Sequence, residues 1–340
     1  MTTAGESQAL AWPLATTLPP SWRAVGAKKH KARHRGEECP PQRRRPMQRA
    51  TDAERRALME RVERAHRQSA LPVRSGVAPL PASLEEGPLL SSVLRHNLQH
   101  EGIVEQMRHG GLLSPRLVYV DFGAGDGGLC RCVECAAAGG RFLLVDRSRK
   151  PNMPAGVEVD WLCADVSTLH ASELQRAATG ECVVVSNHLC GQALDLAVQS
   201  SMLAFHLDSP APRLLGVMAA TCCHDQCAWD SFLGQRAFVE WGLDQADFAV
   251  ICAWSRMAPR RGKADHTRER VVREAARLGV TPAEAAQLGL HCRRLMDTAR
   301  LLHLQKHGFS VSLCEHVDFR VTADNVMLCA VRRPGGNSRV

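Results

Sequence analysis

The chain has 340 residues, 45% of them hydrophobic, which suffices to bury one large core or two modest ones. Its fourteen cysteines are scattered through apolar runs, which favours a reduced, intracellular protein of the nucleus or cytoplasm over a disulfide scaffold. No segment has the unbroken apolar length of a membrane span, and the N-terminus lacks the order of a secretory signal, so the protein is expected to be soluble.

Residues 1–50 carry most of the net charge of +8, because they contain ten Lys/Arg against three Glu. These basic residues lie among Pro, Gly and Ser with no apolar period, which predicts a disordered tail suited to attracting a polyanion. A nuclear-import signal or a solubilising arm is the alternative interpretation.

Residues 51–88 are expected to form a helix and a Pro-rich linker. The helix covers 51–69, where opposite charges alternate and apolar positions are few, so it is predicted to lie on the surface. Residues 89–113 then predict a helix that enters the main domain. This domain is expected over 89–334, followed by a short tail at 335–340.

The main domain alternates short apolar runs with helical stretches, the pattern of a parallel sheet built from βαβ units. Only about ten residues separate the last two strands, so these two are expected to pair antiparallel. A helical insertion at 264–307 is expected between strands five and six. An α/β sheet of this kind resembles the Rossmann-like class I fold of S-adenosylmethionine-dependent methyltransferases. The seven predicted strands are Leu117–Phe122, Phe142–Asp146, Val159–Cys163, Cys182–Asn187, Leu214–Ala220, Phe309–Cys314 and Asn325–Val331.

The first predicted strand ends in a glycine-rich turn, Asp121-x-Gly123-x-Gly125-x-Gly127, followed by a helical stretch. Backbone amides at such a turn can approach a nucleoside cofactor without obstruction by side chains. However, Gly123, Gly125 and Gly128 also satisfy the G-x-G-x-x-G pattern of dinucleotide sites. The loop alone therefore does not separate the two cofactor classes.

Polar residues end the next three strands at the same predicted edge of the sheet. Asp146 ends the second strand, where a carboxylate can accept hydrogen bonds from both ribose hydroxyls. Asp165 follows the third strand, where an adenine amino group would lie, and Asn187 ends the fourth. With the closing hairpin, these residues favour S-adenosylmethionine over a nicotinamide cofactor; a structural loop with solvated acids is the alternative.

The loops after strands four and five supply the candidate catalytic groups. His188 and Asp195 follow strand four, and His224 and Asp225 follow strand five. A His or carboxylate within hydrogen-bond reach of the reacting proton can act as a general base. His188 is the first choice for this base, with Asp225 or His224 second.

The same two loops contain residue types that bind zinc, namely His188, Cys190, Cys222, Cys223 and Cys227. Their spacing is irregular and lacks paired CxxC units. Packing of small apolar cysteines is therefore favoured, and no metal site is predicted.

At His188–Gly191, Cys222–His224 and Cys227-x-Trp229 the sequence resembles the eukaryotic tRNA 2′-O-methyltransferases that modify the fourth nucleotide of the acceptor stem. The likeness is continuous from about Leu89 to Val331. It implies S-adenosylmethionine as methyl donor and a ribose 2′-hydroxyl of the tRNA acceptor stem as acceptor. A non-catalytic RNA-binding protein on this fold, or a methyltransferase for a protein or small molecule, stays open as the alternative.

The sequence departs from the family pattern in several places. Members usually carry Cys/His zinc-binding modules near the N-terminus, whereas Cys39 is the only cysteine before Cys130. Asp225 stands where a second His is usual, and Asn187 where a Lys is frequent. The basic tail is a possible replacement contact to the phosphates of the acceptor stem. A second basic group inside the insertion would overhang the site, or form a solvated helix face: Arg256, Arg260, Arg261, Lys263, Arg268, Arg270 and Arg273.

Overall fold

The computed structural model describes residues 50–77, 91–148, 153, 155–205, 213–259 and 264–332, with backbone only at 264–267. The predicted basic tail, apart from Ala50, and the short tail at 335–340 lie outside these residues, as do 78–90 of the predicted linker. No helix in the described part of the chain is long and apolar enough to cross a membrane.

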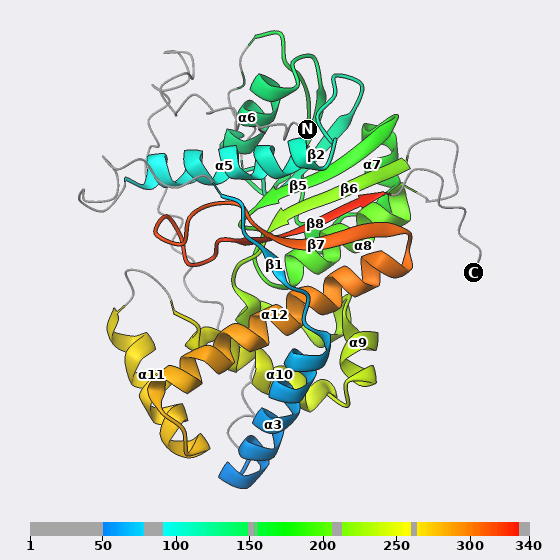
Figure 1. The fold of residues 1–340 in the computed structure, drawn as a ribbon. Helices are drawn as coiled ribbons and strands as arrows, with labels where there is room; N and C mark the ends of the chain where they lie inside the picture. Colours follow the sequence, from blue (N-terminus) through cyan, green and yellow to red (C-terminus); the bar gives the residue numbers. More distant parts are fainter. Residues whose placement is uncertain are drawn as a thin grey trace, which may run out of the picture.

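An eight-stranded sheet runs through the structure in the order β1-β7-β8-β6-β5-β2-β3-β4 (Figure 1). Strand β8 is antiparallel to its neighbours β6 and β7, and the other pairings are parallel. From β2 the chain moves outward through β3 and β4, then returns to the other side of β2 to form β5 and β6. This reversal between β2 and β5 is where ligands bind in open α/β sheets. The strands are β1 (Val73–Arg74), β2 (Val118–Phe122), β3 (Arg141–Asp146), β4 (Glu158–Cys163), β5 (Glu181–Asn187), β6 (Arg213–Ala220), β7 (Phe309–Glu315) and β8 (Val326–Arg332).

The seven predicted strands are all present, with ends within one residue of the prediction, and the antiparallel pairing of the last two is confirmed. The predicted count of seven was wrong, because β1 adds an eighth strand, parallel to β7. A strand of two residues after Pro72 is too short to show a period in the sequence.

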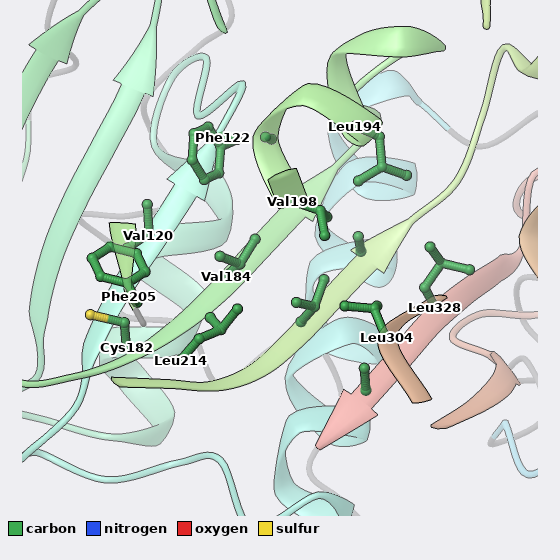
Figure 2. Close-up of a cluster of buried hydrophobic side chains, with 14 of the residues drawn as sticks. Val120, Phe122, Cys182, Val184, Leu194, Val198, Phe205, Leu214, Leu304 and Leu328 are labelled. Carbon is green, nitrogen blue, oxygen red and sulfur yellow. The ribbon is translucent and has the colours of Figure 1, made fainter. Parts of the chain in front are cut away.

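Side chains of each central strand alternate between two apolar layers. Val120 and Phe122 of β2 face one layer, whereas Tyr119 faces the other. Figure 2 shows the first layer, where Val184 of β5 lies near Val198 of α8. Burial on both faces explains why these strands read as nearly continuous apolar runs.

Helices cover both faces of the sheet. The first layer packs against α7 (Ala171–Ala177), α8 (Gln192–Ala204) and the C-terminal end of α12 (Pro282–Lys306). The opposite layer packs against α5 (Ser92–His109) and α6 (Gly128–Ala136). Ser91 caps α5 by accepting a hydrogen bond from the Leu94 amide, which starts that helix three residues later than predicted.

The remaining helices form a separate apolar cluster beside the sheet (Figure 1). It joins α3 (Asp52–Ser69), α9 (Gln235–Glu240), α10 (Gln245–Trp254) and α11 (Ala264–Leu278) to α12 from Ala285 to Ala299. Helices α9 to α12 all lie between β6 and β7 in the sequence. Helix α12 contacts both this cluster and the sheet, so it links the two parts of the fold.

Helix α3 is more buried than the predicted surface helix. Thr51 and Glu54 form a capping box, but Leu58, Val62 and Ala65 pack into the helical cluster. Arg55 is 1% exposed and pairs with Glu274 of α11. The prediction of a surface helix failed because α3 buries only a narrow apolar stripe and the side chain of Arg55. The alternating charges in the sequence conceal both.

Candidate active site

The glycine-rich turn after β2 follows a backbone path that favours glycine. Gly123, Gly125 and Gly127 have φ angles of 73°, 55° and 75°, in the left-handed region. The Gly123 amide donates to the carbonyl of Val145 at 2.8 Å, which ties the turn to β3. Helix α6 starts immediately afterwards, and its first amide, that of Gly128, donates to Oδ1 of Asp126 at 3.0 Å. The turn thus has the left-handed backbone that its three glycines permit.

Two carboxylates adjoin this turn and differ in their hydrogen bonding and in the direction of their pKa shifts. Asp146 Oδ2 accepts the Gly125 amide at 2.9 Å, and Oδ1 accepts the Ser148 amide at 2.7 Å. Burial opposes ionisation of Asp146, but these hydrogen bonds outweigh it and lower the pKa. Asp121 is 1% exposed and its Oδ2 has no hydrogen-bond partner. Burial, with the nearby charges of Asp146 and Asp126, raises the pKa of Asp121 well above its usual range.

The other two predicted cofactor residues also lie at this edge of the sheet. Asp165 follows β4 and accepts the Ser167 amide at 2.9 Å, and this bond holds the pKa of Asp165 below its usual value. Asn187 ends β5, and its buried Oδ1 has no hydrogen-bond partner. Asp165 is therefore occupied in a local turn, whereas Asn187 keeps an unsatisfied acceptor.

His188, directly after β5, has a left-handed backbone with φ of 64°. Such strain in a residue other than glycine persists only where the surroundings enforce it. The Nε2 of His188 is hydrogen-bonded to Oε1 of Gln99, a buried residue of α5. Burial, reinforced by His96, lowers the pKa of His188 despite the opposing effect of Asp324. His188 is therefore a neutral imidazole at pH 7, and this arrangement leaves the Nδ1 lone pair available as a base.

The loops after β5 and β6 are neighbours, as predicted. A Cβ at Gly191 would lie 2.5 Å from Cβ of Gln226 and 2.6 Å from its carbonyl oxygen. Only glycine at position 191 permits this approach. The contact brings residues 188–191 beside 222–227, so His188 and Asp225 lie on adjoining loops.

His224 and Asp195 lie in a buried ionic network instead of on a ligand surface. Asp195 is 0% exposed and accepts from Nε and Nη2 of Arg300 at 2.9 and 2.7 Å. His224 is 2% exposed and bonds through Nε2 to Asp297 Oδ1 at 2.9 Å, while Arg300 Nη1 donates to the same oxygen at 3.2 Å. Both predicted catalytic residues are thus engaged in holding α12 against the loops after β5 and β6.

Asp225 is the more accessible carboxylate of this loop pair. Its Oδ2 lies 3.4 Å from Nε of Arg256, which belongs to the basic group predicted in the insertion. Arg260, Arg261 and Lys263 of that group lie outside the described residues. Asp225 therefore stays a candidate base, although the Arg256 charge favours its role in an ion pair.

Two histidines near His188, the partly buried His100 and the buried His316, have no role in the sequence predictions. Burial lowers the pKa of His100 to about 3 and that of His316 to about 4. Nδ1 of His100 and both ring nitrogens of His316 have no hydrogen-bond partner. His100 follows His96 by one helical turn, which is a detectable signal, whereas nothing in the sequence marks His316.

A family model described as Methyltransferase TRM13 matches residues 98–331, which covers the sheet from β2 onward. The chain belongs to this family. Curated TRM13 proteins are distant relatives. This chain is 27% identical over 274 residues to "tRNA:m(4)X modification enzyme TRM13" of Debaryomyces hansenii, and the match covers 70% of this chain and 59% of the relative. It is 25% identical over 316 residues to the TRM13 homolog of Mus musculus, covering 70% of this chain and 64% of that relative. The chain thus spans about three fifths of the length of these TRM13 relatives.

Solved structures of other methyltransferases resemble the chain weakly. The plantazolicin methyltransferase BpumL, crystallised with a pentazolic desmethylPZN analog and SAH, is 9% identical with a TM-score of 0.33, and the match covers 72% of this chain and 86% of that one.

The loop residues of this TRM13 family member fit S-adenosylmethionine, the methyl donor that the family supports. The unpartnered Oδ2 of Asp121 and Oδ1 of Asn187 are acceptors that require a donor or a cation. S-adenosylmethionine carries a sulfonium and an ammonium group, whereas a dinucleotide would bring a pyrophosphate beside Asp121, Asp126 and Asp146. Like charges that lie close together repel one another. The charge of the loop therefore favours the methyl donor over the dinucleotide, which the glycine spacing left open.

Proposed function

We propose that this chain is a tRNA 2′-O-methyltransferase that transfers a methyl group from S-adenosylmethionine to a ribose 2′-hydroxyl at position 4 of the acceptor stem. The TRM13 match over the domain that carries the acidic glycine loop is the main support. The relatives are named as tRNA modification enzymes, and the ribose hydroxyl and its position rest on the family resemblance of the sequence.

We also propose that the sheet is the Rossmann-like class I methyltransferase sheet. Without the edge strand β1, its order and its one antiparallel strand, β8, fit that fold. Helices α9 to α12 then form an insertion beside the acceptor site, with Arg256 of that insertion next to Asp225.

The residues suggest a direct displacement. When bound, S-adenosylmethionine supplies a methyl group already activated by its positive sulfur. Asp146 would accept the cofactor's ribose hydroxyls, and Asp121 and Asn187 would face its polar groups. His188 would accept the proton of the tRNA 2′-hydroxyl at Nδ1 as the new C–O bond forms and the S–C bond breaks. Positioning supplies much of the rate, because the donor needs no further activation.

The test is to incubate the protein with methyl-labelled S-adenosylmethionine and unmodified tRNA and to map the labelled nucleotide. Label on the ribose of nucleotide 4 is the expected result. Label on a base or another position would overturn the acceptor assignment. Cofactor binding without transfer to any RNA would favour the non-catalytic alternative.

His188→Ala tests the base. We expect the rate to fall by about 10²–10⁴-fold, the usual contribution of a general base, while calorimetry shows unchanged affinity for S-adenosylmethionine. Asp225→Ala serves as the matched comparison on the neighbouring loop. Full activity of His188→Ala together with loss in Asp225→Ala would move the base to Asp225.

A further inference from the structure

Three cysteines converge where the loops after β5 and β6 meet. The Sγ atoms of Cys190, Cys222 and Cys223 all lie within 4.8 Å of one another, and those of Cys190 and Cys222 are 3.2 Å apart. Among the described residues, this is the group of Cys, His, Asp or Glu side chains with the spacing of a metal site. Cys227, although close in sequence, is engaged with Arg300 Nη2 at 2.9 Å.

The backbone is shaped to bring these thiols together. Consecutive side chains of a continuing strand would point to opposite faces, so Cys222 and Cys223 could not share a ligand. At Cys223, however, φ is 46°, in the left-handed region. Within the described part of the chain, Cys223 and His188 are the non-glycine residues with positive φ, and both belong to these two loops. Strain of this kind concentrates at ligand sites.

Apolar packing does not account for the arrangement. Cys190 and Cys223 are partly exposed, and only Cys222 is buried. Three thiolates at this distance repel one another unless a cation lies between them, and a soft divalent ion prefers such ligands.

We propose that Cys190, Cys222 and Cys223 bind a Zn²⁺ ion through their three Sγ atoms, leaving a fourth coordination position for water or a substrate oxygen. Tetrahedral zinc with Zn–S bonds of about 2.3 Å separates its sulfur ligands by about 3.8 Å. The Cys190–Cys222 distance of 3.2 Å is shorter than this separation, and no pair of the three Sγ atoms is more than 4.8 Å apart, so changes of about 1 Å or less suffice. The partly exposed Cys190 and Cys223 provide the access that an open position requires.

The ion would tie together the loops that carry His188 and Asp225. Gly191 already brings these loops into backbone contact, and the thiols flank that contact at Cys190 and at Cys222. This proposal is independent of the acceptor of the methyl group, because metal binding needs neither tRNA nor S-adenosylmethionine.

The 340-residue chain, stripped of metal by a chelator under reducing conditions, is titrated with Co²⁺ alone. We expect one equivalent to produce thiolate-to-cobalt charge-transfer absorption and the visible bands of a tetrahedral ion, both removed by Zn²⁺. Cys190→Ser, Cys222→Ser and Cys223→Ser should each lower Co²⁺ affinity at least ten-fold. Cys135→Ser, an exposed cysteine of α6, and Cys39→Ser should bind as the unsubstituted protein does.

A second measurement uses the unsubstituted protein, so it tests the proposal even if the cysteine variants fail to fold. In the unsubstituted protein, Zn²⁺ should protect Cys190, Cys222 and Cys223 from alkylation by iodoacetamide, mapped by peptide mass spectrometry, and leave Cys135 reactive. Absence of the thiolate band, a band that survives all three loop substitutions, or protection confined to other cysteines would overturn the proposal.

Discussion

At the residue scale, Asp121 combines complete burial with an unsatisfied carboxylate oxygen. Its raised pKa means that the folded chain retains a proton that the unfolded chain, with a pKa near 3.9, has already lost. Asp121 therefore stabilises the folded chain most at low pH. Its contribution to the free energy of unfolding declines as the pH rises from the pKa of Asp121 in the unfolded chain to its pKa in the folded chain. A cation bound beside Asp121 would stabilise the ionised carboxylate and so offset the cost of its burial.

Asp121→Asn separates these two effects. We expect its free energy of unfolding at pH 8 to equal or exceed that of the natural chain, because the substitution removes a buried ionisable group. The Kd for S-adenosylmethionine should rise at least ten-fold, because the negative charge beside the cofactor is lost. Urea denaturation and calorimetry measure the two quantities. Asp230→Asn, an exposed position in the 3-10 helix Trp229–Ser231, is the control and should change neither quantity. Unchanged cofactor affinity in Asp121→Asn would contradict the cofactor assignment.

Gln99 is a positioning residue for His188, because its Oε1 fixes the Nε2 tautomer. Gln99→Glu places a carboxylate against the ring and should raise the pKa of His188, which shifts the acid limb of the pH–rate profile to higher pH. In the natural chain that limb should lie below the usual histidine value of about 6.5. Glu105→Gln, on the exposed side of α5, should leave the profile unchanged. A uniform loss of rate without any shift would mean that Gln99 is only structural.

The sequence predicts the cofactor side of the site better than the catalytic side. Glycines and acids at strand ends lie where a parallel sheet must place them, so Asp121 and Asp146 follow from the pattern alone. The burial of Asp195 and His224 does not, because it depends on Arg300 and Asp297 of α12. Arg300 lies 105 residues from Asp195 in the chain, and a local pattern cannot encode that pairing.

At the element scale, α12 is held to the loops after β5 and β6 by charges as well as by apolar contacts. Arg300 and Asp195 form two hydrogen bonds in a region without solvent access, where removal of one partner leaves the other buried and uncompensated. Asp297 links the same arginine to His224. These bonds fix the position of α12, which in turn supports the loop that carries Asp225.

Asp195→Asn should therefore lower the free energy of unfolding by about 3–5 kcal/mol, measured by urea denaturation at pH 7.5. Arg236→Ala is the matched control, since Arg236 pairs with Glu240 on the exposed surface of α9, and should cost less than about 1 kcal/mol. If Asp195→Asn is as stable as the control but inactive with intact cofactor binding, Asp195 has the catalytic role that the sequence suggested.

At the scale of the whole molecule, the folded unit begins before the family match does. Residues 50–77 include α3, packed on α11 and α12, and β1, added to β7. The Leu71 amide donates to Thr298 Oγ1 at 3.1 Å, and Trp254 Nε1 joins Arg55 on the carboxylate of Glu274. Removal of this segment would take Arg55 away from the buried carboxylate of Glu274. It would also expose the apolar side chains of α11 and α12 that α3 covers.

Two truncations separate this structural segment from the basic tail. A chain lacking residues 1–77 should lose several kcal/mol of stability or fail to fold, because the deletion removes apolar packing and a buried ion pair together. A chain lacking 1–49 should unfold as the full chain does, yet bind tRNA more weakly and with a smaller salt dependence. Each phosphate that the shortened chain no longer neutralises reduces the slope of log K against log salt by roughly 0.7–0.9. An unchanged slope at reduced net charge would show that the ten Lys/Arg of residues 1–50 do not bind RNA, which favours their use in transport.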